Sequence, residues 1–388
     1  AAGVRKAPFG VNQGALVSIK IGDGAVVSMV GGVGNYLDNQ WNCATNPHTA
    51  GSSFKPFVYL AAIERGLINE NGYVDDTPMT VKQEDGSDYK PKNFDGRHLG
   101  LTTVAKAFAW SRNIPALRTA MSVGIPAVID VANRAGVRSK MEPHLALALG
   151  SAAVTPLEMA NAYATIARGG EYMTPMLVRR TATKTGCALD SFSGDRYTVF
   201  DRSAVAQIVD LMQDVVAHGT GQLAKLPDRP VAGKTGTADQ GKDLWFVGFT
   251  PDMVTAVWGG NKDNHAVGGG VTGGTIMTSI WRNYNQAYYR QVPTPKGFFM
   301  CSNRGPAMFG ADKAYVPLST SASSNGANYR SPSSNYVPYA VQVARRRTNA
   351  VRQSRAAVSR SQRKRTPTGG SINRADHGIT DYSWSRRR

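Results

Sequence analysis

Cysteine is scarce in this sequence, and its scarcity excludes two classes of fold. Only Cys43, Cys187 and Cys301 occur among 388 residues, and no C-x-x-C pair is present. A disulfide scaffold needs many paired cysteines and a zinc knuckle needs closely spaced ones, so both are excluded. At most one disulfide could form, which leaves the redox compartment undecided.

Long apolar runs are also missing. The longest, residues 57–63, is far shorter than the roughly 20 residues that a membrane-spanning helix needs. The chain opens without Met and without a signal-like apolar stretch. Either the protein is cytoplasmic, or a preceding part of the chain that carries a targeting signal is missing.

Acidic residues are few, with 27 Asp and Glu against 45 Lys and Arg, a net charge of +18. Residues 341–388 hold 13 of the basic residues and two acids, a net +11, which leaves +7 on the other 340 residues. Residues 293–340 are rich in Ser, Pro, Asn and Gly and cannot bury enough apolar surface to fold. We therefore expect a folded part within residues 1–292, a linker over 293–340 and a disordered basic tail over 341–388.

The folded part alternates between strand and helix patterns. Hairpins are predicted around Gly22-Asp23-Gly24 and Pro251-Asp252, and the helix that follows Gly51 is expected to use a serine cap and to end at Gly66. Other predicted helices cover 102–110, 156–167, 202–217 and 275–289. Clean βαβ units are absent, which favours a mixed α/β or α+β domain with an antiparallel sheet.

The first short motif is S-x-x-K, Ser52 to Lys55, at the start of a predicted helix. Residues three apart share a helical face, so the hydroxyl and the amine are expected to lie side by side. A serine becomes a nucleophile when a neighbouring base takes its proton, and a buried lysine can be that base. Taken alone, the motif is explained better by a helix N-cap serine followed by a lysine whose amine reaches solvent.

The second motif is S-x-N, Ser111 and Asn113, at the end of the second predicted helix. It offers a hydroxyl for proton relay and an amide for binding substrate. Helix ends favour both residue types anyway, so the pattern alone carries little weight.

The third motif is K-T-G, which begins at Lys234 and continues through Thr235 and Gly236 to Thr237. A lysine and two hydroxyls could grip a carboxylate, while the glycine would allow close approach of substrate. A phosphate loop is a rival, but that motif needs a glycine at position 228, which is Asp.

A second K-T-G, residues 184–186, has no following strand pattern, and we interpret it as a chance match in a surface hairpin or loop.

The order of these three motifs, at separations of 59 and 123 residues, is specific. With the stretches TAGSSFKPFVYLAAIERG, YKPKNFDGRHLGLTTVAKAFAWSRNIPALR and VAGKTGTADQGKDLWFVGFTPDMVTAVWGG, residues 10–290 resemble the transpeptidase domain of class A (bifunctional) penicillin-binding proteins. The resemblance implies a fold like those of penicillin-binding proteins and serine β-lactamases. In that fold a central antiparallel sheet has helices on both faces, and there is an all-helical subregion.

For the chemistry, the resemblance implies that Ser52 is acylated by a D-Ala-D-Ala stem peptide, with Lys55 as its base. Ser111 would relay a proton to the leaving amine, and Asn113 would bind the substrate or Lys55. Lys234, Thr235 and Thr237 would hold the terminal carboxylate, and Gly236 belongs to the same substrate-binding strand. The backbone N–H groups of Ser52 and Thr237 would form the oxyanion hole. No metal or organic cofactor is implied.

The resemblance also implies a setting for the enzyme, the periplasmic face of the bacterial inner membrane. Peptidoglycan stem peptides and β-lactam antibiotics are the expected partners, and membrane association would come from a missing N-terminal segment. Residues 1–12 would be the end of an interdomain linker and 13–292 the transpeptidase domain. The family's N-terminal glycosyltransferase domain lies outside this sequence, so we expect a fragment and assign it no glycan polymerisation.

Other functions stay open at this point. A serine β-lactamase needs a base for deacylation, but Glu158 precedes Asn161 by three residues where an E-x-x-x-N loop has four, so a helix-surface Glu is favoured. A penicillin-sensing domain fits the YKPKNFDG stretch poorly. The basic tail could simply be solvated, or it could bind anionic wall polymers or lipid head groups. Nucleic-acid binding is disfavoured because no stacking-aromatic module is found.

Overall fold

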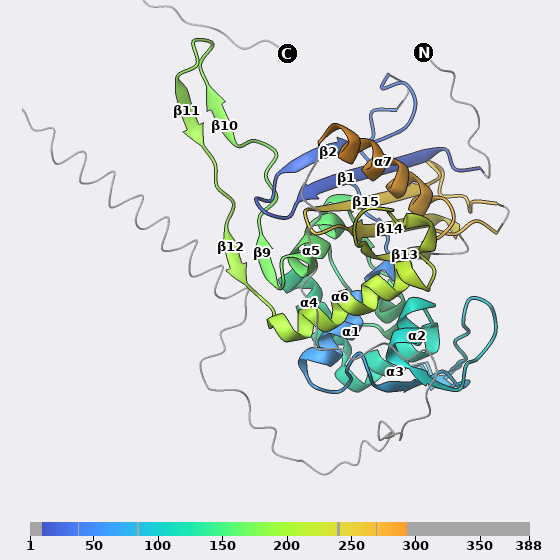
Figure 1. Ribbon diagram of the computed structural model, residues 1–388. Helices are drawn as coiled ribbons and strands as arrows, with labels where there is room; N and C mark the ends of the chain where they lie inside the picture. The colour runs from blue at the N-terminus through green and yellow to red at the C-terminus, as the bar shows by residue number, and fades with distance from the viewer. Residues whose placement is uncertain (1–9, 38, 84, 239–240, 269, 293–388) are drawn as a thin grey trace, which may run out of the picture. The chain divides into compact units, whose positions relative to one another are not determined.

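A five-stranded antiparallel sheet forms the centre of the folded part of the chain (Figure 1). The computed structural model describes residues 10–37, 39–83, 85–238, 241–268 and 270–292; the predicted linker and basic tail lie outside the described residues. The strands are β13 (Ala232–Ala238), β14 (Asp243–Phe249), β15 (Met253–Gly260), β1 (Gln13–Lys20) and β2 (Val26–Val30), in that spatial order. Both predicted hairpins are confirmed, as the pairs β1–β2 and β14–β15. β13, which carries the K-T-G motif, is an edge strand.

Helices cover both faces of this sheet, as the resemblance implied. Successive residues of a strand point to opposite faces, so Trp245 and Val247 enter one core while Leu244 and Phe246 enter another. The first core also contains residues of α1 (Lys55–Glu64) and α5 (Pro156–Ala167). The second contains Trp281 of α7 (Met277–Gln291).

A helical subregion lies on the α1 side of the sheet. It contains α2 (Val104–Ala109), α3 (Asn113–Val123), α4 (Ile125–Ala135) and α6 (Arg202–Ala217). α1 is buried at every position except Glu64, which confirms the prediction that it is a core helix. Among the described residues no single helix has the length and apolar character of a membrane span; α3 and α4 reach it only as a pair bent by 97°.

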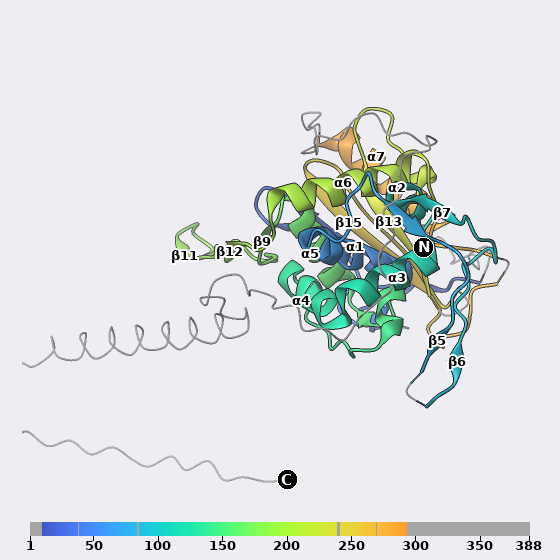
Figure 2. The ribbon, with the colours of Figure 1, turned by 90° about the horizontal axis from the view of Figure 1, so that it is seen from below.

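The remaining elements are short. Over the described ranges they comprise three 3-10 turns, η1 (Gly51–Phe54), η2 (Leu145–Leu149) and η3 (Gln222–Ala224), and ten strands, β3 (His48–Thr49), β4 (Tyr73–Asp75), β5 (Val81–Lys82), β6 (Asp88–Tyr89), β7 (Leu101–Thr103), β8 (Ala153–Val154), β9 (Glu171–Met173), β10 (Arg180–Ala182), β11 (Ala188–Ser191) and β12 (Arg196–Thr198). The pairs β9–β12 and β10–β11 form an arm that extends from the body of the domain (Figure 1). β5 and β6 form a second projecting hairpin, seen in Figure 2.

Helix starts and bounds agree with the sequence for α2, α5 and α6 but not for the cap of α1. The Thr103 hydroxyl accepts from Lys106 N–H at the start of α2, and the bounds of α5 and α6 are as predicted. The predicted serine cap of α1 is wrong. The turn η1 precedes that helix, and the Ser53 hydroxyl donates to the Ala50 carbonyl (2.7 Å) within it.

Candidate active site

Ser52 lies in η1, the turn that leads directly into α1. Its side chain is half-buried, and its hydroxyl makes no hydrogen bond to any residue that the structure describes. Lys55, three residues later, is the first residue of α1. The S-x-x-K motif therefore places the Ser52 hydroxyl, which is not hydrogen-bonded to any described residue, one turn before the buried amine of Lys55.

Glycines allow η1 to lie against β13. A Cβ on Gly51 would come within 2.8 Å of the Thr237 carbonyl oxygen, and one on Gly150 within 1.9 Å of the Gly51 oxygen. A Cβ on Gly236 would meet the Ala50 oxygen at 2.8 Å. Gly236 thus serves the packing of η1 on the strand; its predicted role toward substrate stays a prediction.

Lys55 is held by the loop that contains the S-x-N motif. Its Nζ donates to the carbonyl oxygens of Ser111 (2.6 Å) and Arg112 (3.1 Å) and to Asn113 Oδ1 (2.8 Å). The Ser111 hydroxyl lies 3.4 Å away. The structure thus brings together Lys55 and the S-x-N residues, which are 56 to 58 positions apart in the chain.

Ser111 has an unusual backbone conformation, with φ of 56°. This left-handed region costs a residue with a side chain about 1 kcal/mol or more, and such strain is concentrated at functional sites. The conformation aims both the carbonyl and the hydroxyl of Ser111 at lysine amines. The strain is retained because burial of those amines requires oxygen partners.

Lys234 reaches the same hydroxyl from β13. Its Nζ donates to Ser111 Oγ (2.8 Å) and to the Thr235 carbonyl (3.2 Å), and its side chain is fully buried. Ser111 Oγ therefore lies between two lysine amines, which is the arrangement a proton relay needs.

Burial makes both lysines weak bases for their type. It lowers the pKa of Lys234 to about 7. It also lowers the pKa of Lys55 well below its usual value, an effect that the neighbouring charges of Lys234 and Arg112 increase and that Asp76 opposes. Near neutral pH an amine of this kind can exist uncharged and accept a proton.

The hydroxyls of the K-T-G strand are turned toward two further segments. Thr235 Oγ1 is hydrogen-bonded to Thr220 Oγ1 (2.6 Å), and Thr237 Oγ1 accepts from Gly273 N–H (3.2 Å). Period-two alternation puts both threonines on one face of β13 and Lys234 on the other. Sequence reasoning missed Thr220 and Gly273, since nothing in their local pattern marks them.

Other candidates prove structural. Glu158 completes the cap of α5 and accepts from the N–H groups of Arg138 and Ser139 (2.9 and 2.8 Å), so it ties a loop to the helix. Lys184 lies in the exposed turn between β10 and β11, as predicted. Residues 233–235 lie within β13, which fits a strand and not a phosphate loop.

Sequence comparison finds relatives over most of the folded part. Residues 14–284 match the family described as the penicillin binding protein transpeptidase domain. Penicillin-binding protein 1A of Aquifex aeolicus is 33% identical over 282 residues, and that of Neisseria gonorrhoeae is 36% identical over 283. These matches cover 72% and 70% of this chain, but only 39% and 35% of the relatives' own lengths.

Solved structures agree. Penicillin-Binding Protein 1A from Haemophilus influenzae has a TM-score of 0.69 at 27% identity, covering 74% of this chain and 49% of that one. PonA1 from Mycobacterium tuberculosis, in complex with penicillin V, has a TM-score of 0.67 at 28% identity and covers 76% and 82%. The fold and family that the sequence resembles are thereby confirmed, and this chain belongs to the penicillin-binding protein transpeptidase domain family.

Proposed function

We propose that this chain is a serine DD-transpeptidase that crosslinks peptidoglycan stem peptides through an acyl-enzyme on Ser52. The observation that carries the proposal is the meeting of two buried lysine amines at the Ser111 hydroxyl, directly beside the turn that presents Ser52. A binding protein would have no need for two buried amines with lowered pKa values.

In acylation, uncharged Lys55 takes the Ser52 proton while Oγ attacks the carbonyl carbon of the D-Ala-D-Ala bond. The N–H groups of Ser52 and Thr237 stabilise the oxyanion. The C–N bond then breaks, and Ser111 passes a proton to the departing D-Ala amine, with Lys55 the ultimate donor. Lys234 holds the terminal carboxylate of the substrate, together with the hydroxyls of Thr235 and Thr237.

In the second half-reaction, an amine from a neighbouring stem peptide attacks the ester carbonyl. A new amide bond forms, Ser52 leaves as the hydroxyl, and the amine proton returns through Lys55. No metal or organic cofactor takes part in this scheme. Penicillins enter the same first step, because their strained amide carries a carboxylate that Lys234 can hold.

The setting of this chemistry is the bacterial cell envelope, on the periplasmic face of the inner membrane, where peptidoglycan is found. The substrate is large, polymeric and outside the cytoplasm, so the domain must work there. Binding of anionic wall polymers or lipids by the tail, residues 341–388, stays a prediction on residues outside the described part.

The test is covalent labelling by a fluorescent penicillin, followed by intact mass and peptide mapping. Wild type should gain one long-lived adduct on Ser52, and Ser52→Ala should gain none. Ser53→Ala is the matched control, since its hydroxyl only bonds within the turn, and it should still be labelled. Rapid loss of the adduct by hydrolysis would indicate a β-lactamase instead, and absence of any adduct on wild type would contradict the proposal.

A further inference from the structure

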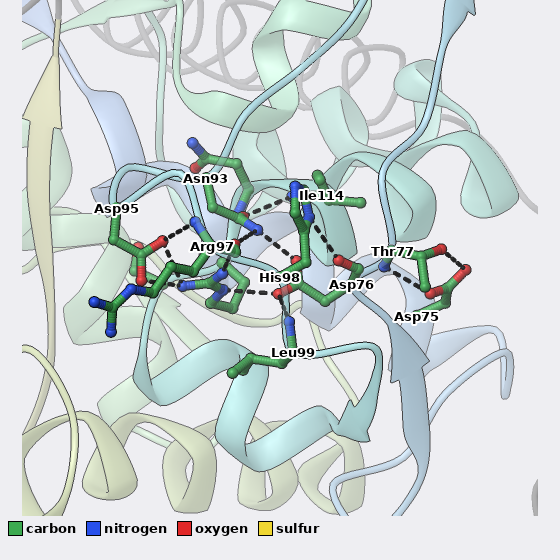
Figure 3. A network of polar contacts seen from close by, with 12 residues as sticks. Asp75, Asp76, Thr77, Asn93, Asp95, Arg97, His98, Leu99 and Ile114 are labelled. Carbon is green, nitrogen blue, oxygen red and sulfur yellow. Dashed lines mark hydrogen bonds and ion pairs between the residues drawn. The ribbon is translucent and has the colours of Figure 1, made fainter.

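A network of polar side chains around Asp76 and Asn93, drawn in Figure 3, is hydrogen-bonded to the loop Ser111–Asn113. At its centre is Asp76, which directly follows β4 and is fully buried. Its carboxylate accepts from Asn93 Nδ2 (2.7 Å), from the Leu99 N–H (2.9 Å) and from Arg112 Nε (2.9 Å). A buried carboxylate is costly unless it is paired and hydrogen-bonded, and here it is both.

Asn93 connects this carboxylate to the start of α3. Its Oδ1 accepts from the backbone N–H groups of Asn113 (2.8 Å) and Ile114 (3.4 Å), which have no partner inside the helix. Its Nδ2 donates to Asp76 and to the Arg97 carbonyl (2.9 Å). Asn93 thus fixes the backbone of Asn113, whose side chain contacts Lys55.

Arg112 joins the network to the site through its own backbone. Its guanidinium donates to Asp76, to both oxygens of Asp95 (3.0 and 2.9 Å) and to the Arg97 carbonyl. Its carbonyl oxygen accepts from Lys55 Nζ (3.1 Å). A displacement of this side chain must therefore move an acceptor of the lysine amine.

We propose that Asp76, Asn93 and Arg112 are positioning residues for the serine chemistry proposed above, on which this inference rests. They hold the S-x-N loop on Lys55, and Asp76 offsets the charge of Arg112 near the Lys55 amine.

Within the described part of the chain, three charged groups act on Lys55. Lys234 approaches from β13, Arg112 from the connection between α2 and α3, and Asp76 from the end of β4. The cation of Arg112 lowers the pKa of Lys55 and the anion of Asp76 raises it. Removal of either one alone should consequently move the protonation of Lys55 in opposite directions.

The experiment measures the pH dependence of the penicillin acylation rate, whose rising limb follows the loss of a proton from Lys55. In Asp76→Asn the charge of Arg112 is no longer offset, so the limb should move to lower pH by about half a pH unit or more. In Arg112→Gln the limb should move to higher pH by a similar amount. The double variant should return close to wild type.

Two further variants serve as an independent check and as a control for this experiment. Asp95→Asn removes the more exposed partner of Arg112, so it should shift the limb as Asp76→Asn does, but less. Asp75→Asn is the matched control, because Asp75 bonds the Thr77 N–H (2.8 Å) and Arg118 (3.2 Å) and should leave the limb unmoved. If Asp76→Asn fails to fold, the limb should still move in opposite directions in Asp95→Asn and Arg112→Gln.

A fall in rate with an unmoved limb, or shifts of the same sign in both single variants, would overturn the inference and leave the network merely structural. These outcomes all require that wild type is acylated on Ser52. Absence of acylation in wild type would instead overturn the proposed function, so the two failures are distinguishable.

Discussion

The same tripeptide, K-T-G, occurs twice in this chain and has two unlike environments. Residues 184–186 form the exposed turn of the hairpin β10–β11, where the Thr185 hydroxyl, among the described residues, bonds only its neighbour Thr183 (2.8 Å). Residues 234–236 lie inside β13, an edge strand with helices on both faces of its sheet, and Lys234 is fully buried.

The difference shows that the environment of each K-T-G copy, and not the tripeptide alone, decides what its side chains can do chemically. Lys184 is exposed in the turn between β10 and β11. Lys234 has lost its water and faces a shared hydroxyl, so its amine can exchange protons near neutral pH. Each residue of one copy is the natural control for the matching residue of the other.

The largest difference in acylation rate between the two K-T-G copies is expected when their lysines are replaced. Lys234→Ala should slow penicillin acylation by about 10²- to 10³-fold, because under the proposed function it removes the amine that holds the substrate carboxylate, and it also removes a partner of Ser111. Lys184→Ala should leave the rate near wild type. Stopped-flow fluorescence measures both, and equal losses in the two variants would show that the environment of β13 is not the deciding factor.

Alanine substitutions at the two glycines should differ both in the size of their effect and in its physical cause. Gly236→Ala places a methyl group 2.8 Å from the Ala50 oxygen and 2.9 Å from Trp245 Cβ, so it should cost about 1–3 kcal/mol of stability. It should also slow acylation about tenfold by displacing Ser52. Gly186→Ala meets no atom of the described residues within 4 Å but has φ of 88°, so it should cost about 1 kcal/mol and leave acylation unchanged. Thermal unfolding and acylation rates together test this, and slowed acylation in Gly186→Ala would be the contrary result.

The pH dependence of stability should also separate the two lysines. The pKa of Lys234 is lowered to about 7 in the folded protein, against 10.5 without the fold. Between these values the unfolded chain binds more protons, so the Lys234 contribution to the free energy of unfolding rises with pH, by up to about 2 kcal/mol from pH 7 to 9. Lys234→Met should lose this rise and Lys184→Met should keep it, as urea denaturation at several pH values can show. A rise of equal size in both variants would argue against a buried, uncharged Lys234.

The threonines should show the smallest contrast. Thr235→Val leaves the Thr220 hydroxyl without its 2.6 Å partner and should cost about 1 kcal/mol of stability. Thr185→Val breaks an exposed contact and should cost close to nothing. Differential scanning calorimetry measures both, and a smaller loss in Thr235→Val than in Thr185→Val would contradict the comparison.

Local sequence signals predicted a large share of the fold. The hairpins and the bounds of α5 and α6 follow from turn residues, caps and periodicity that act within a few positions. The helices α3 and α4 were missed, because neither begins with a side-chain cap and Gly124 separates them closely. Asn93 and Asp95 stood in the stretch YKPKNFDG that carried the family resemblance, yet no local rule assigns them a role in holding Arg112.

By itself, the sequence determined two hairpins of the central sheet, the helices α1, α2, α5, α6 and α7, the order of the three motifs and, through their resemblance, the family. Only the tertiary structure decided which lysines are buried and that the Ser111 hydroxyl lies between the amines of Lys55 and Lys234. The physical reason is that a pKa, a close approach at a glycine and a shared hydroxyl depend on desolvation and on partners from distant parts of the chain. These properties are determined only when β13, η1 and the loop after α2 pack together.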